Sequence, residues 1–303
     1  MARRPVVHVL GNIHPSAMAL LGREADLLTE ADPFPSACDG IVVRTRKITG
    51  AEIAGCPNLK VIGKHGVGVD AIDVAAATAA GIAVESTPGA NAESVADLAI
   101  GFALALIRNL VPITLALRDG RTVEPHLRIG WDLGELRAGI VGYGAVGRAV
   151  GRRLVGGFGT PTIAYSPGRI GSGPERGVDF APSLPALLAQ SRIVFLHMPL
   201  TPATRGVIDP AALASMPTGS YLVNCARGGI VDEAALAGAL ASGHLAGAAS
   251  DVFAVEPPTP DSPLLREPGF LAMPHLGAST NGGLERVGTE IARKVLDVIA
   301  ARS

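Results

Sequence analysis

Short runs of apolar residues, many of them β-branched, alternate with Ala-rich stretches along almost the whole chain. In the first third of the chain these runs lie at 6–10, 40–44, 59–63 and 82–85. Each has the length and composition of a strand that is buried on both faces of a parallel sheet. The stretches at 51–54 and 73–81 have helical composition. The alternation predicts an α/β fold in which helices flank parallel sheets.

A second series of the same kind follows a long, mostly apolar segment at 91–110. That segment predicts one long buried helix, with Asn91 and Ser94 as candidate N-caps, and 118–132 is expected to be loop. Strands are then expected at 139–141, 162–165, 193–197, 221–224 and 246–251. Helices are expected at 145–154, 184–189, 210–214, 233–242 and 283–300. Two series predict two domains of related design, with the last helix returning to the first domain.

Composition excludes several classes of protein. The chain has 303 residues, 48% of them hydrophobic and 17% charged, which is enough to bury a core and excludes global disorder. A formal net charge of -1 gives no basic surplus for nucleic acid. No apolar run reaches the roughly 18 residues of a membrane span, and the short apolar run at 6–10 lacks a signal-peptide cleavage pattern. Three unpatterned cysteines indicate a reducing compartment, so we expect a cytoplasmic protein without a metal site.

The sequence Gly142-Tyr-Gly-Ala-Val-Gly147 matches G-x-G-x-x-G between an expected strand and an expected helix. In that context the pattern predicts a dinucleotide site rather than a plain Gly-rich turn. Gly142 would form the tight turn and Gly144 would let a pyrophosphate approach the backbone. Gly147 would let helix and strand pack closely. The free N–H groups at the helix start would bind the phosphates.

The next expected strand does not end in the carboxylate that usually binds the ribose 2′-hydroxyl. Ser166-Pro-Gly-Arg169 follows it instead. Ser166 and Arg169 would suit a 2′-phosphate, which favours NADP over NAD. The alternative, at nearly equal weight, is that Arg169 is a solvated loop residue.

Three later segments carry side chains suited to acid–base chemistry on a carboxylic acid. Arg227 follows an expected strand and precedes two glycines, which suits a bidentate grip on a carboxylate. Glu256 precedes two prolines, and His275 follows Pro274. A Glu behind a His would fix the tautomer of the imidazole and make it an effective acid–base group. Singly, each residue also has an ordinary structural explanation.

Several motifs in order resemble those of the D-isomer-specific 2-hydroxyacid dehydrogenase family, which includes D-3-phosphoglycerate dehydrogenases and hydroxypyruvate reductases. The resemblance covers essentially the whole chain and rests on the glycine motif and on segments 61–73, 86–97, 197–201, 224–229 and 274–278. It implies two Rossmann-like domains with the active site in the cleft between them. The substrate domain would comprise 1–96 plus 280–303 and the nucleotide domain 97–279, and the family is commonly dimeric.

The resemblance also implies roles for single residues. Arg227 would bind the carboxylate and keto oxygen of a 2-keto acid, His275 would be the general acid–base, and Glu256 would support it. Asp251 would hold the nicotinamide carboxamide. Further cofactor contacts would be made by Ala145, Val146, Met198, Pro199, Cys225, Ala226 and Gly277. Formate oxidation is disfavoured, because formate enzymes of the family typically place Gln where this chain has Glu256.

The sequence indicates the substrate-binding residues less clearly than the cofactor-binding ones. The loop 63–68 would present successive N–H groups to a carboxylate, so Val67 and Gly68 are candidate contacts. Lys64 stands where phosphoglycerate dehydrogenases usually carry Arg, and with Arg44 it would bind a second anionic group. The alternative is that these charges are solvated.

Two classes of function remain open from the sequence. The favoured one is an NAD(P)-dependent enzyme for a small acid such as 3-phosphoglycerate, hydroxypyruvate or glyoxylate. The other is a dinucleotide-sensing interaction protein of the same fold, because the family also contains transcriptional corepressors.

Overall fold

A computed structural model describes residues 3–302 and divides the chain into two compact units. One unit comprises the chain up to Ser94 together with the chain from Ala278 onward, and the other comprises Val95–Gly277. The sequence places these boundaries after 96 and before 280.

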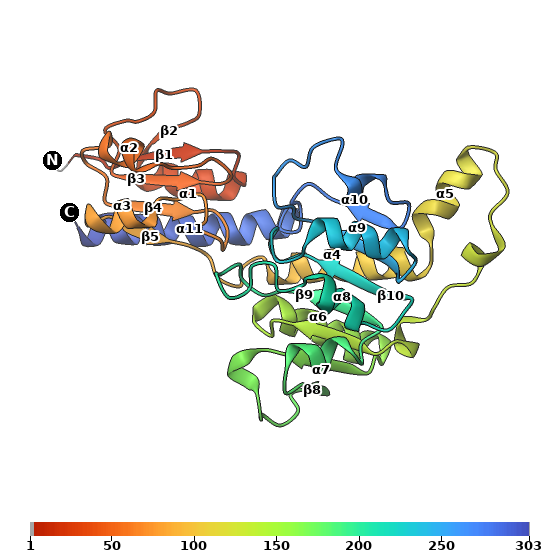
Figure 1. The fold of residues 1–303 in the computed structure, drawn as a ribbon. Coiled ribbons are helices and arrows are strands. Elements are labelled where there is room, and N and C mark those ends of the chain that lie inside the picture. The colour runs from red at the N-terminus through yellow and green to blue at the C-terminus, as the bar shows by residue number, and fades with distance from the viewer. Residues whose placement is uncertain (1–2, 303) are drawn as a thin grey trace. The chain divides into compact units, whose positions relative to one another are not determined.

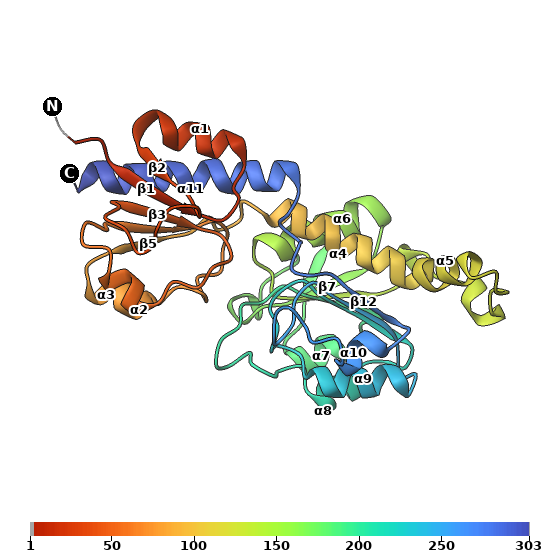
Figure 2. The ribbon, with the colours of Figure 1, turned by 90° about the horizontal axis from the view of Figure 1, so that it is seen from above.

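The first unit contains a five-stranded parallel sheet in the order β2-β1-β3-β4-β5. Its strands are β1 (Val6–Leu10), β2 (Asp26–Leu28), β3 (Gly40–Val43), β4 (Val61–Lys64) and β5 (Ala83–Glu85). The helices α1 (Pro15–Glu24) and α11 (Asn281–Ala301) cover one face, and α2 (Gly50–Ala54) and α3 (Val74–Ala79) cover the other (Figure 2). Because side chains alternate across a strand, β3 sends Val42 to the first face and Ile41 to the second.

The second unit contains a seven-stranded parallel sheet in the order β12-β11-β10-β9-β6-β7-β8. Figure 1 shows β9 and β10 of this sheet. Its strands are β6 (Ala138–Val141), β7 (Thr162–Tyr165), β8 (Val178–Phe180), β9 (Ile193–Leu196), β10 (Ser220–Asn224), β11 (Leu245–Ser250) and β12 (Phe270–Ala272). Residues of α4 (Ala92–Ile107) and α6 (Ala145–Phe158) pack on one face. Those of α7 (Leu184–Leu188), α8 (Pro210–Ser215), α9 (Glu233–Ala241) and α10 (Pro263–Arg266) pack on the other. The predicted α/β class with two Rossmann-like parallel sheets is confirmed.

The chain order reverses between β6 and β9, which are neighbours in the sheet. In open α/β sheets, ligands bind outside the carboxyl ends of the strands at this kind of position. By this rule, the ends of β6 and β9 are the candidate ligand-binding position of the second unit.

The prediction of one uninterrupted helix over 91–110 is wrong. Two helices occur, α4 and α5 (Leu110–Arg118), separated at Asn109, whose φ is 51°. Asn tolerates this left-handed conformation, and Pro112 in the first turn of α5 has no N–H to continue the hydrogen bonds of α4. The Asn109 Nδ2 also donates to the Leu127 carbonyl at 3.1 Å. Ser94 is not an N-cap, because it lies inside α4 and its hydroxyl bonds Thr280 Oγ1 at 2.9 Å.

Sequence patterns missed α1, α10 and the three-residue strands β2, β8 and β12. The N-cap of α1 is His14, whose ring accepts from the Ser16 N–H, and histidine is not a usual capping signal. The expected loop at 118–132 contains a short 3-10 turn, Pro125–Arg128. Within residues 3–302, no single helix is long and apolar enough to cross a membrane, and α4 with α5 passes that test only as a pair bent by 60°.

Candidate active site

The glycine motif forms the turn from β6 into α6. Gly142 has a φ of +94°, and a Cβ there would lie 2.6 Å from the carbonyl carbon of His197. A Cβ at Gly147 would lie 2.2 Å from the Gly142 oxygen, whereas a Cβ at Gly144 meets nothing within 4 Å. Gly144 is the N-cap of α6 and supplies no side chain to cap the helix. The turn therefore leaves open space and helix N–H donors where a pyrophosphate would bind.

Other expected cofactor contacts follow strands on the same edge of the sheet. Met198 and Pro199 come after β9, and Cys225 and Ala226 after β10. Cys225 is buried, and burial together with the nearby Asp251 carboxylate raises the pKa of its thiol far above the usual value. It therefore stays a protonated packing residue near neutral pH.

Asp251 organises the segment that carries His275. Its carboxylate accepts from the N–H groups of Leu276 at 2.7 Å and Gly277 at 2.8 Å. Burial raises the pKa of Asp251, although these two N–H groups act in the opposite direction. Its carbonyl oxygen also accepts from the His275 N–H at 2.8 Å. Asp251 thus holds the loop in place, a role that sequence reasoning did not include.

His275 and Glu256 form a close pair in the second unit. His275 Nδ1 lies 2.7 Å from Glu256 Oε2, and Glu256 Oε1 accepts from the Phe253 N–H at 3.0 Å. Burial acts to raise the pKa of Glu256, but the His275 and Phe253 hydrogen bonds and the His275 and Arg227 charges together hold it below its usual value. His275 also has a φ of 57°, an uncommon backbone conformation that is often found at functional sites.

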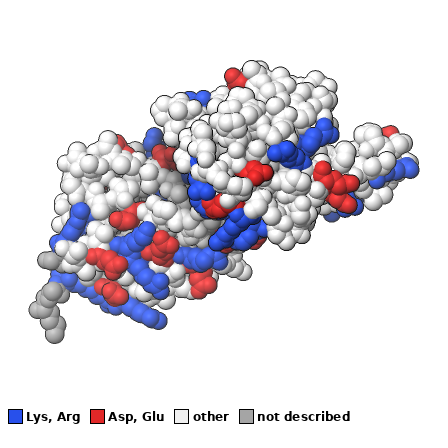
Figure 3. Space-filling model, turned by 90° about the horizontal axis from the view of Figure 1, so that it is seen from below, with Lys and Arg blue, Asp and Glu red and all other residues white. Residues whose placement is uncertain are grey.

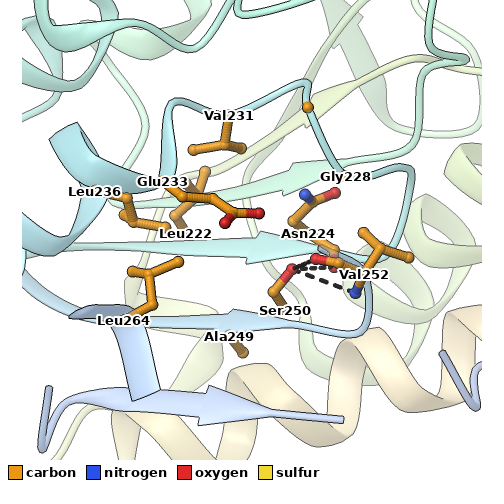
Figure 4. A pocket seen from close by; sticks show the side chains of 11 residues that line it. Leu222, Asn224, Gly228, Val231, Glu233, Leu236, Ala249, Ser250, Val252 and Leu264 are labelled. Atoms are coloured by element: carbon orange, nitrogen blue, oxygen red, sulfur yellow. Dashed lines mark hydrogen bonds between the residues drawn. The ribbon is translucent and has the colours of Figure 1, made fainter. Parts of the chain in front are cut away.

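Arg227 is placed by a turn that follows β10. Asn224 Oδ1 accepts from the Ala226 N–H at 3.0 Å, and its Nδ2 donates to the Arg227 carbonyl at 3.2 Å. A Cβ at Gly228 would lie 1.8 Å from the Phe253 oxygen, so the loops carrying Arg227 and Glu256 touch at this glycine. Asn224, Glu233 and Ser250 line a cavity of about 10 Å³ beside these loops (Figure 4). The charge of Arg227 is one of the influences that lower the pKa of Glu256.

Within the first unit, the structure brings Arg44 and Lys64 together. They lie at the ends of neighbouring strands, and Lys64 Nζ donates to the Arg44 carbonyl. Arg44 donates to the Asn12 carbonyl at 3.2 Å and to Ser279 Oγ at 3.0 Å. Burial, with the charges of Arg44 and Lys64, lowers the pKa of His65 to about 4. Val67 and Gly68 lie in the loop that follows, and Val67 is exposed.

The structure gives Arg169 a partner that the sequence did not indicate. Its Nη2 lies 2.6 Å from Glu175 Oε2, so Arg169 is not a solvated loop residue. Ser166 is the N-cap of the 3-10 turn Pro167–Arg169. Arg148, which directly follows the glycine motif, pairs with the same carboxylate. In the sequence, the place of Arg148 directly after Gly147 was the signal that a further charged residue lies close to the glycine motif.

The chain is similar in sequence to known proteins. A family model described as "D-isomer specific 2-hydroxyacid dehydrogenase, NAD binding domain" matches residues 100–277. D-3-phosphoglycerate dehydrogenase from Mycobacterium tuberculosis is 38% identical over 304 residues, which is 96% of this chain and 56% of that protein. The Homo sapiens enzyme of the same name is 40% identical over 270 residues, 88% of this chain and 50% of its own. The chain thus spans about half the length of the curated relatives it matches.

Solved structures match over nearly the full chain. A protein from Thermus thermophilus is 32% identical with a TM-score of 0.87, covering 98% of this chain and 97% of its own. An NADPH-dependent glyoxylate/hydroxypyruvate reductase from Sinorhizobium meliloti, in complex with NADP and malonate, is 29% identical with a TM-score of 0.81, covering 96% and 92%. An NAD-dependent formate dehydrogenase from Staphylococcus aureus, in complex with NAD, is 28% identical with a TM-score of 0.83, covering 95% and 94%.

Proposed function

The chain belongs to the D-isomer specific 2-hydroxyacid dehydrogenase family, and we propose that it is an NAD(P)-dependent oxidoreductase acting on a small 2-keto or 2-hydroxy acid. The observation that carries this proposal is the His275–Glu256 pair, 2.7 Å apart, beside the loop of Arg227. An acid–base pair, a carboxylate-binding guanidinium and a pyrophosphate turn are the parts that such a reaction needs.

Each part of the candidate site has its own role in the proposed reaction. A bound nicotinamide dinucleotide supplies or accepts the hydride, and the turn at Gly142–Gly147 binds its pyrophosphate. Arg227 orients the substrate carboxylate and stabilises charge on the carbonyl oxygen. Because Nδ1 of His275 is hydrogen-bonded to Glu256, Nε2 is the nitrogen that donates a proton to the carbonyl oxygen during reduction. In the reverse direction neutral His275 accepts the hydroxyl proton, and Glu256 stabilises the resulting imidazolium.

For the substrate, we propose an acid with a second anionic group held by Arg44 and Lys64. Their proximity in the first unit supports a phosphorylated or sulfonated acid, as do the names of the Mycobacterium and Homo sapiens relatives. Hydroxypyruvate and glyoxylate remain the competing substrates, and the name of the Sinorhizobium reductase supports those.

We further propose a cytoplasmic homodimer. The support for the dimer is the exposure of apolar side chains on α5 and in the segment after it, where Leu117 is 65% exposed and Ile129 is 82% exposed. Figures 1 and 2 show α5 extending away from the sheet of its own unit. A second copy of the chain would cover these side chains.

Initial rates with NADPH and NADH test the function. The panel comprises glyoxylate, pyruvate, hydroxypyruvate, phenylpyruvate, 3-phosphohydroxypyruvate and sulfopyruvate. Fast turnover of the phosphorylated or sulfonated acid alone would assign Arg44 and Lys64 to the second anion, and preference for NADPH would assign Ser166 and Arg169 to the 2′-phosphate. If the protein binds nucleotide but turns over no acid of the panel, the proposed enzyme function is contradicted and a dinucleotide sensor is favoured.

A further inference from the structure

Beside the start of α6, two arginines share one carboxylate. Glu175 Oε1 pairs with Arg148 and Glu175 Oε2 with Arg169, the latter at 2.6 Å. The Arg148 guanidinium lies over the Tyr143 ring, 5.1 Å from its centroid, and that of Arg169 lies 4.8 Å from the Phe180 centroid. These contacts fix both guanidinium groups toward a single anion.

The local backbone holds Glu175 in place. The N–H and carbonyl of Glu175 bond the carbonyl and N–H of Val178 at 2.9 and 3.0 Å, closing a two-residue turn. The two turn residues, Arg176 and Gly177, have φ values of 51° and 81°, as a tight hairpin turn requires. A Cβ at Gly177 would lie 2.9 Å from Val155 Cγ1, so the turn packs closely on α6. The carboxylate is therefore part of a built structure.

The cluster of Arg148, Arg169 and Glu175 lies where the adenosine end of a dinucleotide is expected. Arg148 follows the last glycine of the pyrophosphate turn, and Arg169 follows β7, the strand after which the ribose 2′ position is normally read. Tyr143, Arg148, Arg152, Glu175 and Arg176 line a pocket of about 190 Å³. Figure 3 shows one face of the molecule, on which basic and acidic side chains are interspersed.

We propose that Glu175 is a cofactor-specificity residue that competes with the 2′-phosphate of NADP for Arg148 and Arg169. Glu175 occupies one terminal nitrogen of each arginine, Nη1 of Arg148 and Nη2 of Arg169, and it carries a charge of the same sign as a phosphate monoester. A 2′-phosphate at these arginines is therefore repelled by Glu175 and competes with it for their positive charge. A ribose 2′-hydroxyl carries no charge, so Glu175 shifts the balance from NADP toward NAD.

This inference rests on the proposed dinucleotide function. It is tested by binding alone, with 5′-AMP and 2′,5′-ADP, which differ only in the 2′-phosphate. Isothermal titration calorimetry would give Kd values for the wild-type protein, Glu175→Gln and Asp179→Asn. Asp179 is an exposed carboxylate on β8, so its variant controls for a general change in charge.

We expect Glu175→Gln to bind 2′,5′-ADP at least about tenfold more tightly than wild type, with the Kd of 5′-AMP unchanged. Asp179→Asn should change both Kd values by less than about twofold. The unchanged 5′-AMP affinity shows that the variant is folded. Adding Arg169→Gln to Glu175→Gln should remove the gain.

Equal or weaker 2′,5′-ADP binding by Glu175→Gln, with 5′-AMP binding retained, would overturn the competition and leave the dinucleotide function standing. Weaker binding would mean that Glu175 positions the arginines for the phosphate, and equal binding would mean that Glu175 does not affect phosphate binding. Failure of the wild-type protein to bind 5′-AMP, NADH and NADPH would overturn the dinucleotide function together with this inference.

Discussion

The Nδ1 atom of His275 lies 2.7 Å from Oε2 of Glu256, and the other oxygen of that carboxylate is held by the Phe253 N–H. The imidazole thus has a fixed orientation that leaves Nε2 as the nitrogen without this bond, the one to which we assign the proton transfer. Against the effect of burial, hydrogen bonds from His275 and Phe253 and the charges of His275 and Arg227 hold the pKa of Glu256 below its usual value. The three side chains form one electrostatic unit.

Replacing Glu256 by Gln should lower kcat by about 100-fold and leave KM for the keto acid within about threefold, because a neutral amide does not stabilise the imidazolium. Steady-state kinetics on the best substrate of the panel measure both constants. Asp261→Asn, an exposed carboxylate in the same Pro-rich segment, is the matched control and should change neither. Equal kcat values for Glu256→Gln and wild type would refute a supporting role for Glu256.

Gly144→Ala should weaken dinucleotide binding at least about tenfold while leaving the protein folded. A Cβ at Gly144 meets no protein atom within 4 Å, so the substitution fills only the space assigned to the pyrophosphate. Fluorescence titration with NADH and NADPH gives the affinity, and thermal unfolding gives the stability.

Gly156→Ala is the control for Gly144→Ala. Gly156 lies in the same helix, and a Cβ there also meets nothing within 4 Å. We expect it to keep cofactor affinity and to gain up to about 1 kcal/mol of stability from helix propensity. A Gly144→Ala protein that binds both cofactors like wild type would place the pyrophosphate elsewhere.

Sequence patterns predicted what depends on local rules. Gly142 has a positive φ, and a Cβ at Gly147 would meet the Gly142 oxygen, so these two glycines meet local backbone needs that their spacing made predictable. The α/β class followed from the alternation of apolar runs. The break at Asn109 was missed, although Pro112 lies three residues on, in the first turn of α5, where proline commonly marks a helix start. Glu175 was also missed, since its pairing with Arg148 depends on how a turn packs on a helix 27 residues away in sequence.

Acid should destabilise the fold through two buried histidines. Burial, with the charges of Arg44 and Lys64, lowers the pKa of His65 to about 4, and burial lowers that of His197 to about 3. Below the unfolded-state value of about 6.5, the unfolded chain binds protons that the folded chain does not. The free energy of unfolding should therefore fall as pH drops from about 6.5 toward 4, by up to about 1.4 kcal/mol per pH unit for each histidine.

Urea unfolding at pH 7.5, 6.0 and 5.0 measures this slope. His65→Asn should reduce it by about 1 kcal/mol per pH unit between pH 6.0 and 5.0, whatever its effect on stability at pH 7.5. His126→Asn, at an exposed position, should leave the slope unchanged. A His65→Asn protein with the wild-type slope would show that His65 binds a proton in the folded state across this range.

The exposed apolar surface on α5 gives the last prediction. Leu117 projects from α5 with 65% of its surface exposed, and a charge there would lie inside the interface if two copies pair through this face. Leu117→Asp should therefore convert a dimer to a monomer at micromolar concentration, as measured by sedimentation velocity. Leu265→Asp, at an exposed leucine on α10, should remain dimeric. A Leu117→Asp protein that sediments as a dimer would show that the copies associate through another surface.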